Sequence, residues 1–580
     1  MSESVSVLDQ KTLENLPVND PAEALYYVPG IDVSPRTRFG HFTPLSIQGS
    51  ESRHVLVMVD GIPFNTQASG QADVLSALPL NNLDRIEVIE GGSSSVWGSS
   101  LGGVVNLITK TPTHSPVPKG HVTGSWAGFD TKENSFDVTG AIKKLDYFFS
   151  GDYRESGGSR VKGDAGNRDD TLSKKAFGKL VYPLSDILRA TASFGSSDIE
   201  VNEGVYPSAG SRQHIPYDAR YGLIRLDADP EERNHYETAL KFNRQLIRVD
   251  TLDGFDGGLQ SGVRTSDNYY GFELKNVRKF REEDTFVMGG DLSYHILKSS
   301  QLVSARNILF GAPYTNYTLV LDPVDVIAGA RYDFNEEFGG QFSPSLGAVW
   351  HAPASPETLV RVNVSRSFNA PPLLWRYFED LAPGVTASNP DLQPERAWTY
   401  EAGVESQPWE KLFLSFKAYH SEIEDAIATV ERNGLFIKDN FDRFRQQGFA
   451  LESRLALAKE WALSFAANFN DAENRNTHLT VRNRGVTRPG FLLGLQGQVP
   501  CGLRVNLIGR YDRWDSSPSA LANDRTFIFD GRLSKKMATI RGVGVTCFLN
   551  VYNLTNSKYW SDIDFPLPER YIEGGVTLDF

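Results

Sequence analysis

Runs in which every second residue is apolar recur along this chain, and the chain ends on one of them. In an extended strand over residues 571–580, one face would consist of Ile572, Gly574, Val576, Leu578 and Phe580. The intervening residues, mostly polar, take the opposite face. A strand with lipid outside and a wet lumen inside needs this two-residue period. Strands of soluble sandwiches also alternate, so the last run does not decide the matter by itself.

Charged members of these runs indicate a polar interior. Arg361 stands between two valines on an alternating run, and Glu573 stands between Ile572 and Gly574. A basic group facing lipid at mid-membrane would cost about 2–4 kcal/mol, and an acidic group somewhat less. We therefore expect both side chains to face inward.

The composition fits strands and turns, and it argues against several classes of protein. The 580 residues include 51 glycines and four methionines. No stretch approaches the ~18 uncharged apolar residues that a transmembrane helix needs. The net charge of −13 argues against a nucleic-acid binder. Cys501 and Cys547 lie in alternating apolar runs and give no disulfide framework.

The first 112 residues differ in character from the rest. Asp20 suits the N-cap of a short helix, and Pro21 suits its first position. Residues 55–59 form a continuous apolar run, as a buried strand does. This part of the chain is therefore predicted to be a small mixed α/β domain.

The length of the remainder sets the size of the barrel. We predict the N-terminal domain over residues 1–112, a linker over 113–120 and a β-barrel over 121–580. At about 21 residues for each strand with its connection, the barrel has about 22 strands. A barrel of this size has a lumen wide enough to need a plug.

Several sequence blocks occur in a characteristic order. The N-terminal domain has L-Y-Y-V-P-G-I-D-V at 25–33, L-S-I-Q-G at 45–49, V-L-V-M-V-D-G-I-P at 55–63, L-D-R-I-E-V-I-E-G at 83–91, S-V-W-G at 95–98 and G-G-V-V-N-L-I-T at 102–109. The barrel has F-S-P-S-L-G at 342–347, R-S-F-N-A-P at 366–371, N-P-D-L-Q-P-E at 389–395 and N-V-Y-N-L-T-N-S-K-Y at 550–559. Through these blocks the chain resembles the TonB-dependent outer-membrane receptors over essentially its full length.

This resemblance implies both a fold and a function. The fold would be membrane all-β, a 22-stranded antiparallel transmembrane β-barrel with the small N-terminal α/β domain as a plug inside the lumen. The protein would be a monomer in the outer membrane of a Gram-negative bacterium, in contact with lipid and lipopolysaccharide. It would import a bulky metal chelate, driven by TonB with ExbB and ExbD. No enzymatic activity, required cofactor or nucleic-acid partner is implied.

The chain departs from the family pattern in two places. The family usually has Arg-Gly where this chain has Gln48-Gly49, so one buried basic group of the plug is missing. Arg53, Arg85 and Glu87 remain as candidates for polar contacts between plug and barrel. The short box that recruits TonB is not recognisable and no signal peptide is visible. We therefore expect the natural N-terminus to lie upstream.

By the resemblance, two plug loops face outward, over residues 34–44 and 64–73. Arg, Phe and His side chains in the first could bind an anionic, partly aromatic chelate by charge and stacking. The second is neutral and rich in amides, which suits hydrogen bonds to a large polar ligand. Ordinary solvated loops are the alternative for both. The candidate ligand-binding residues of the plug are Arg36, Arg38, Phe39, His41, Phe42, Phe64, Asn65, Gln67 and Gln71.

Barrel loops supply weaker candidates. Tyr206, Trp375, Tyr377 and Trp514 are loop aromatics that could contact the ligand. Their alternative role is in the aromatic girdle at the membrane interface. The Asp-rich loop over residues 164–170 offers oxygen ligands for calcium, with a solvated acidic loop as the alternative. No other metal site is predicted.

The sequence leaves several ligands and functions open. We favour a ferric siderophore. Cobalamin or a related corrinoid is the alternative, because the spacing from Asp60 through Asn65 to Asp73 looks similar to that of the cobalamin receptor. Haem ranks third, because residues 372–388 contain no histidine and His41 could supply one axial ligand only. A passive porin conflicts with the plug-like domain, and a ligand-sensing receptor needs a further N-terminal domain.

Overall fold

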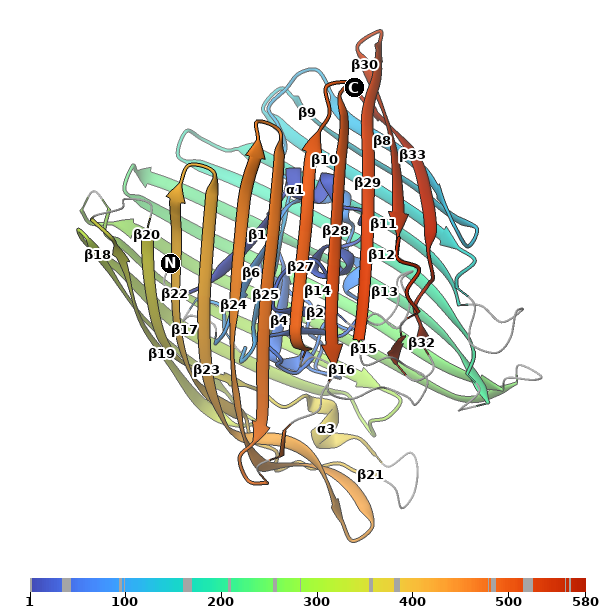
Figure 1. Ribbon diagram of the computed structural model, residues 1–580. Coiled ribbons are helices and arrows are strands. Elements are labelled where there is room, and N and C mark those ends of the chain that lie inside the picture. The colour runs from blue at the N-terminus through green and yellow to red at the C-terminus, as the bar shows by residue number, and fades with distance from the viewer. Residues whose placement is uncertain are drawn as a thin grey trace.

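The computed structural model describes residues 3–33, 43–92, 96–98, 100–159, 169–206, 210–253, 258–281, 283–353, 358–379, 386–477, 479–480, 487–514, 525–558, 560–562 and 565–580. These residues form a closed β-barrel around a small N-terminal domain, which Figure 1 shows in blue inside the ring of strands. Among the helices of these residues, none combines the length and apolar character needed to cross a membrane.

Twenty-two strands follow one another around the barrel within the described residues, all antiparallel, which confirms the predicted fold and strand number. Four shorter strands, β21 (Thr386–Ala387), β26 (Leu479–Thr480), β31 (Trp560–Asp562) and β32 (Phe565–Pro566), lie in connections. The barrel strands are β8 (Lys119–Ala127), β9 (Thr131–Ile142), β10 (Leu145–Ser156), β11 (Asp170–Pro183), β12 (Leu188–Tyr206), β13 (Ser211–Glu231), β14 (Asn234–Asp253), β15 (Leu259–Lys279), β16 (Thr285–Ser299), β17 (Arg306–Leu321), β18 (Val324–Asn335), β19 (Gly339–His351), β20 (Thr358–Asn369), β22 (Glu395–Trp409), β23 (Leu412–Arg432), β24 (Leu435–Ala458), β25 (Trp461–Asn474), β27 (Thr487–Gln498), β28 (Leu503–Trp514), β29 (Arg525–Ile540), β30 (Val543–Tyr552) and β33 (Tyr571–Asp579).

The last strand closes the ring. β33 pairs antiparallel with β8, and the register places Asp579 opposite His121. Phe580 extends this ladder, because its N–H donates to the carbonyl of Gly120 and its own carbonyl accepts from Gly120, both at 3.0 Å. The terminal strand therefore pairs with the first barrel strand and leaves no free edge.

The inward direction of the charged side chains is confirmed as well. Glu573 is buried, and its carboxylate accepts hydrogen bonds from Tyr552 at 2.6 Å and Ser125 at 2.7 Å. Arg361 pairs with Glu405 at 2.7 Å and reaches the carbonyl of Glu3 in the plug at 3.5 Å. The barrel interior is therefore polar, as the alternation predicted.

The two ends of the barrel differ in the length of their connections. At one end, residues 322–323, 410–411 and 541–542 make tight turns between neighbouring strands. At the other end, residues 370–394 join β20 to β22 and contain the helix α3 (Leu373–Tyr377), which lies at the lower end of Figure 1. Outer-membrane barrels have short periplasmic turns and long external loops. The end with α3 is therefore the outer end.

The N-terminal domain is built on a five-stranded sheet in the order β1-β6-β7-β4-β5. Its apolar core includes Leu25, Ile86 and Leu107, all fully buried. Asp20 caps α2 by accepting from the N–H of Glu23 at 2.9 Å, as predicted from the sequence. The elements of the plug are β1 (Val5–Asp9), α1 (Gln10–Asn15), α2 (Pro21–Leu25), β2 (Ile31–Val33), β3 (Leu45–Ile47), three-residue 3₁₀ turns at Ser52–His54, Leu75–Ala77 and Leu80–Asn82, β4 (Val55–Val59), β5 (Ile62–Pro63), β6 (Leu83–Glu90) and β7 (Gly103–Thr109).

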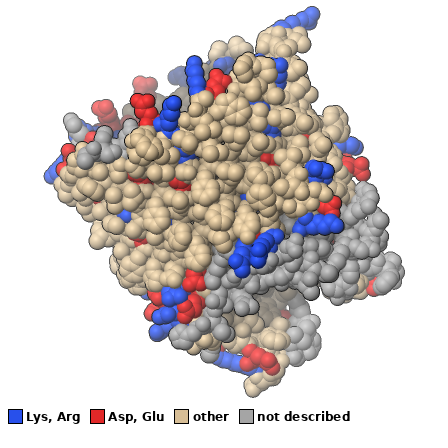
Figure 2. Space-filling view, viewed as in Figure 1, with Lys and Arg blue, Asp and Glu red and all other residues tan. Residues whose placement is uncertain are grey.

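The outside of the barrel is apolar between its ends. Large side chains such as Leu240, Leu274 and Leu346 are about half exposed there. In Figure 2 most charged side chains gather toward the ends of the visible face, with a broad belt of uncharged residues between them. This belt matches the apolar band of a transmembrane barrel.

Loss of Phe580 is expected to impair assembly before it affects ligand binding. Its removal deletes the last two ladder hydrogen bonds between β33 and β8 and the ring that lies against Gly120. We expect less heat-modifiable, folded protein in the membrane, measured by the gel shift of unboiled samples. Phe580→Tyr keeps both hydrogen bonds and the ring, so it should assemble normally. Normal insertion of the truncated chain would refute the role of this residue.

Candidate functional site

A buried ion pair joins the plug to the outer half of the barrel. Arg53 of the plug forms a two-pronged pair with Glu395 at the start of β22, and one of its N–H groups lies 2.8 Å from Glu395 Oε1. His54 Nε2 lies 2.9 Å from the same carboxylate, and the N–H of Ile427 donates to it at 2.8 Å. Glu395 has no exposed surface, and Arg53 is 5% exposed. Arg53 therefore contacts the barrel directly.

A second buried pair links the plug to β23, and here the barrel supplies the cation. Lys417 of β23 binds Glu90 at the end of β6. The amide of Gln48 donates to the other oxygen of Glu90 at 3.2 Å. The N–H of Glu90 also donates to the carbonyl of Ser4 at 3.1 Å, next to β1. Lys417 thus provides a positive charge beside the position where the family usually has a plug arginine.

The other two candidates for plug–barrel contacts form their ion pairs within the plug. Arg85 Nε lies 2.7 Å from Glu87 Oε1, and Arg85 NH1 lies 2.9 Å from Asp84 Oδ2. Asn106 of the neighbouring strand β7 donates to Glu87 at 3.4 Å. Among the described residues, these pairs brace one face of the plug sheet and do not reach the barrel.

The outward plug loop over residues 64–73 is held by its own side chains. The amide of Asn65 accepts from the N–H of Val57 and donates to the carbonyls of Val55 and Gly70, all within 2.9 Å. Gln71 Nε2 donates to Asp73 Oδ1 at 3.3 Å. Asn65, a predicted ligand residue, therefore has its amide fully used in shaping the loop.

Phe64 is also placed differently from our expectation. Its ring is 2% exposed and packs edge-on against Tyr221 of β13, with 5.1 Å between the ring centroids. Its carbonyl accepts from Gln245 of β14 at 3.0 Å. The side chain seals the gap between plug and barrel, and it is not open to a ligand. The position of Phe64, an apolar residue directly after a buried strand, could have indicated that its side chain is buried.

The tip of the same loop docks on α3 and on the barrel wall. The N–H of Gln67 donates to Asp267 of β15, and the carbonyl of Gln67 accepts from the N–H of Leu374 at 3.2 Å. Ala68 packs into an apolar cluster with Leu297 and Leu373. The plug loop and α3 therefore form one continuous surface at the outer mouth.

Trp375 of α3 stands between two cations at this mouth. The guanidinium of Arg53 lies 5.4 Å from the centre of its ring system, and the ammonium of Lys438 on β24 lies 4.6 Å from it. Both distances fall within the range of cation–π attraction. Because Trp375 lies above the plug, it belongs to the mouth and not to a lipid-facing girdle.

Tyr377, at the end of α3, lies in a similar setting. Arg306 stacks on its ring at 4.2 Å, and Arg376 lies 5.2 Å from the same ring. The tyrosine O–H and Arg376 both bind the carboxylate of Glu337, each at 2.6 Å. Together, α3 and its neighbours present cations and aromatic faces side by side. This combination suits an anionic ligand with flat groups.

Several predicted ligand residues fall outside the described residues. These are Arg36, Arg38, Phe39, His41 and Phe42 of the first plug loop. The side chains of Tyr206 and Trp514, and most of the loop over residues 164–170 that we considered for calcium, are likewise not described. Thr43, near the end of the first loop, donates through its N–H to the carbonyl of Asp73 at 3.3 Å. The two plug loops therefore meet at this point.

Asp73 should make the plug loop sensitive to pH. Burial raises the pKa of its carboxyl to about 6, with a smaller contribution from Asp267, against hydrogen bonds from Ser69, Gln71 and Thr66 that favour the charged form. The folded loop thus binds its proton more tightly than the unfolded chain does. The stability of the folded plug loop should therefore be greatest below about pH 4 and should fall as the pH rises to about 6.

Asp73→Asn removes this titration. We expect the variant to gain up to about 2–3 kcal/mol over the native protein at pH 7.5, with the difference vanishing near pH 4. Thermal unfolding of the plug at both pH values measures this. If the variant differed from the native protein by the same amount at pH 4 and at pH 7.5, Asp73 would not be the group that makes the loop sensitive to pH.

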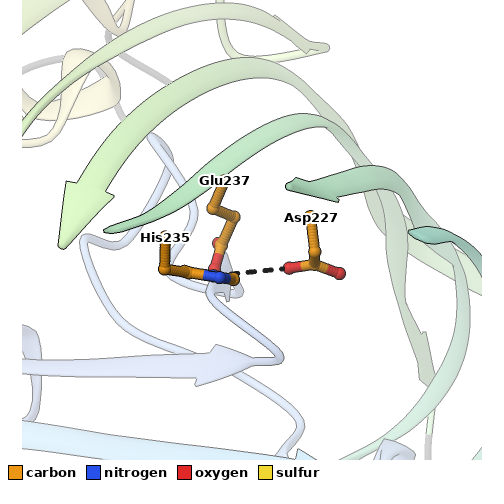
Figure 3. Close-up of side chains that lie close together, drawn as sticks. All are labelled: Asp227, His235 and Glu237. Carbon is orange, nitrogen blue, oxygen red and sulfur yellow. Dashed lines mark ion pairs between the residues drawn. The ribbon is translucent and has the colours of Figure 1, made fainter. Parts of the chain in front are cut away.

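Three potential metal ligands gather at the short-turn end. Figure 3 shows Asp227 of β13 beside His235 and Glu237 of β14, and their ligand atoms lie within 4.8 Å of one another. Arg225 lies 3.2 Å from Asp227, and Lys275 lies 3.4 Å from Glu237. Because both carboxylates already have cationic partners, this cluster is an ion-pair network and gives no reason to add a metal site.

The plug packs less closely on one side of the barrel. A cavity of about 630 Å³ separates α1 from the wall formed by β8, β9, β29, β30 and β33. Its lining includes Glu14 of the plug and Asp137 and Lys536 of the barrel. The cavity lies toward the short-turn end, so the plug has unfilled space beside it there.

Two family models match the chain. The plug-domain model, described as TonB-dependent Receptor Plug Domain, matches residues 1–104. The barrel model, described as TonB dependent receptor-like, beta-barrel, matches residues 120–554. The two matched regions coincide with the inner domain and most of the barrel.

Similar proteins of known role include receptors for different ligands. The iron-regulated outer membrane virulence protein of Vibrio cholerae is 26% identical over 483 residues, which cover 74% of this chain and 67% of that protein. The vitamin B12 transporter BtuB of Vibrio vulnificus is 25% identical over 608 residues, covering 100% of this chain and 92% of that protein. The crystal structure of the siderophore receptor PirA from Acinetobacter baumannii superposes with a TM-score of 0.80 at 16% identity, covering 99% of this chain and 98% of that one.

Proposed function

Because this chain belongs to the TonB-dependent receptor family, we propose that it imports a bulky, anionic metal chelate, and that a ferric siderophore is its ligand. The family acts in the outer membrane as receptors and transporters. The observation that carries the proposal is the arrangement at the outer mouth. There, Arg306 lies against the ring of Tyr377 and Lys438 lies against the ring of Trp375, above the docked plug loop.

The chemistry of this mouth favours a siderophore over a neutral ligand. Ferric siderophores of the catecholate type carry negative charge around flat aromatic groups. Guanidinium groups bind such oxygens in a two-pronged geometry, and tryptophan and tyrosine offer stacking faces. The side chain of Gln67 lies at the tip of the plug loop, whose backbone docks on α3, and its amide could donate to the same ligand.

A corrinoid remains the second candidate. It is favoured by the likeness to the vitamin B12 transporter, which extends over the whole of this chain. The amide-rich plug loop over residues 64–73 also suits a large polar ligand. Most of its amide groups are used within the loop, however, as the three hydrogen bonds of Asn65 illustrate.

The structure suggests how import would proceed. The plug meets the barrel partly through apolar clusters and partly through ion pairs and hydrogen bonds. The polar contacts exchange with water at small net cost. A pull from TonB on the N-terminal side of the plug would act first on β1, the edge strand of its sheet. The cavity beside α1 gives the displaced segment room to move on the periplasmic side.

Ligand titration tests this proposal. Purified receptor would be titrated with ferric enterobactin, cyanocobalamin and haemin, with intrinsic fluorescence as the readout. We expect saturable binding of the ferric siderophore, weakened about tenfold or more in a variant with Arg306→Gln and Trp375→Ala. Trp409→Ala, at an exposed tryptophan near the short-turn end, is the control.

Each other outcome has a definite meaning. Binding of cyanocobalamin alone would replace the siderophore by the corrinoid. Binding of haemin alone, lost in His41→Ala, would overturn the ranking altogether. Equal binding by the double variant and the native receptor would show that the ligand does not use the mouth around α3.

A further inference from the structure

The outer surface of the barrel carries a group of basic residues near the outer end of β13 to β16. The direction of these strands is fixed by Asn243 and Gln245, which donate to the plug carbonyls of Pro63 at 2.9 Å and Phe64 at 3.0 Å. Odd-numbered residues of β14 therefore face the lumen here, and even-numbered residues face lipid. The basic patch consists of Arg220, Arg244, Arg248, Arg264 and Lys298.

The patch sets like charges opposite one another. In the registers of the strands, Arg220 is the direct partner of Arg244, and Arg248 is the direct partner of Arg264. Like charges directly opposite each other on one face destabilise a sheet. A sheet that keeps two such pairs on its outside needs a counter-charge from elsewhere.

Carboxylates of the protein compensate the patch only in part. Arg220 pairs with Asp218 at 2.6 Å, and Arg248 pairs with Asp250 at 2.7 Å. Within the part of the chain that the structure describes, Arg244, Arg264 and Lys298 have no carboxylate within 4.0 Å, and all three are exposed. The patch thus carries three uncompensated positive charges.

The level of the patch in the membrane follows from the aromatic row next to it. Phe194, Phe242, Tyr270 and Tyr294 occupy one register across β12, β14, β15 and β16, with Gly222 of β13 between the first two. Phe194 and Phe242 stack across that glycine with 6.2 Å between centroids. Outward aromatic residues of this kind mark the headgroup level. Arg244 lies two residues beyond Phe242, toward the outer end.

We propose that the basic patch binds the phosphate groups of lipopolysaccharide, the phosphate-bearing glycolipid of the outer leaflet. The patch borders the apolar belt, so acyl chains can pack on the belt while the phosphates reach the guanidinium groups. Arginine is suited to two-pronged binding of phosphate oxygens. A bound phosphate between Arg248 and Arg264 would also relieve their mutual repulsion. This site is independent of the chelate that passes through the lumen.

A binding experiment on the whole receptor tests the site. Detergent-purified protein would be titrated with deep-rough lipopolysaccharide that carries a bis-phosphorylated lipid A, and bound lipid would be counted by native mass spectrometry. The test variant combines Arg244→Gln, Arg264→Gln and Lys298→Gln. Each basic residue near an anionic membrane surface is worth about a factor of five in affinity, so we expect binding about a hundredfold weaker.

Arg278→Gln is the matched control. Arg278 lies on β15, the strand of Arg264, and on the same outward face, but at the short-turn end. This control should bind like the native receptor. Unchanged heat-modifiable migration of the triple variant would show that its loss of lipid does not come from misfolding.

Several results would overturn the proposal. One is native-like lipid binding by the triple variant, and another is an equal loss in Arg278→Gln. Dephosphorylated lipid that binds as tightly as the phosphorylated form would show that the acyl chains alone hold the lipid. Full competition by millimolar inorganic phosphate would make the patch a site for the free ion and not for the lipid.

Discussion

Glu395→Gln is expected to destabilise the docked plug strongly. The variant keeps the shape of the side chain but leaves Arg53 buried and opposite a neutral amide. Removing one partner of a buried ion pair costs about 3–5 kcal/mol, because the remaining charge stays buried without compensation. At about 2 kcal/mol per molar urea, the urea midpoint for plug unfolding should fall by about 2 M.

Glu51 provides the matched control for this prediction. Its carboxylate binds the same arginine at 2.8 Å, but it is 42% exposed. An exposed ion pair contributes about 0–1 kcal/mol, so Glu51→Gln should shift the midpoint by less than about 0.5 M. Equal shifts in the two variants would contradict the assignment of Glu395 as the buried anchor of Arg53.

Lys417→Gln should have an effect of similar size at the second buried pair between plug and barrel. Glu90 is 1% exposed, and Lys417 is the cation bound to it. Its loss should cost about 3–5 kcal/mol of plug stability. Because Glu90 also holds Ser4 beside β1, hydrogen exchange should become faster in β1 and β6. Hydrogen exchange followed by mass spectrometry measures this.

Moving the charge back to the plug should restore the contact. Gln48 already donates to Glu90 at 3.2 Å, so an arginine at this position would place its guanidinium beside the same carboxylate. Gln48→Arg added to Lys417→Gln should therefore recover most of the lost protection. Lys417→Arg should behave like the native protein. If the double variant exchanged as fast as Lys417→Gln alone, Glu90 would not be held by its counter-charge.

Much of the fold could be predicted from the sequence because a barrel repeats one simple rule. The two-residue period in residues 571–580 gave the lipid-facing side, and the charges at Arg361 and Glu573 gave the inward side. Both arguments depend only on neighbours along the chain. The closure of β33 on β8 followed because a barrel leaves no free edge.

The site could be predicted less well because it depends on contacts between distant segments. Phe64 and Asn65 lie in a loop whose position suggested ligand binding. In the structure, Phe64 packs against Tyr221 and Asn65 binds the backbone of the plug, so neither side chain is available to a ligand. Lys417 stands out in its strand only as an inward basic residue. Nothing local shows that Glu90, 327 residues away, is its partner.

Arg53 shows the opposite case, since its partner lies in a block that the sequence already marks. Glu395 ends the N-P-D-L-Q-P-E run, but its role as the buried counter-charge appears only when β22 and the plug are brought together. The missing signal in each case is the pairing, and not the residue type.

The central claim is that this receptor imports its chelate through a plugged barrel by means of TonB. The most direct test follows uptake of a ⁵⁵Fe-labelled ferric siderophore by cells that produce the receptor from its own gene, in an intact strain and in a strain that lacks TonB. We predict binding at the cell surface in both strains and accumulation inside only the intact one. Equal accumulation in the two strains would show passive passage through an open pore and would contradict this account.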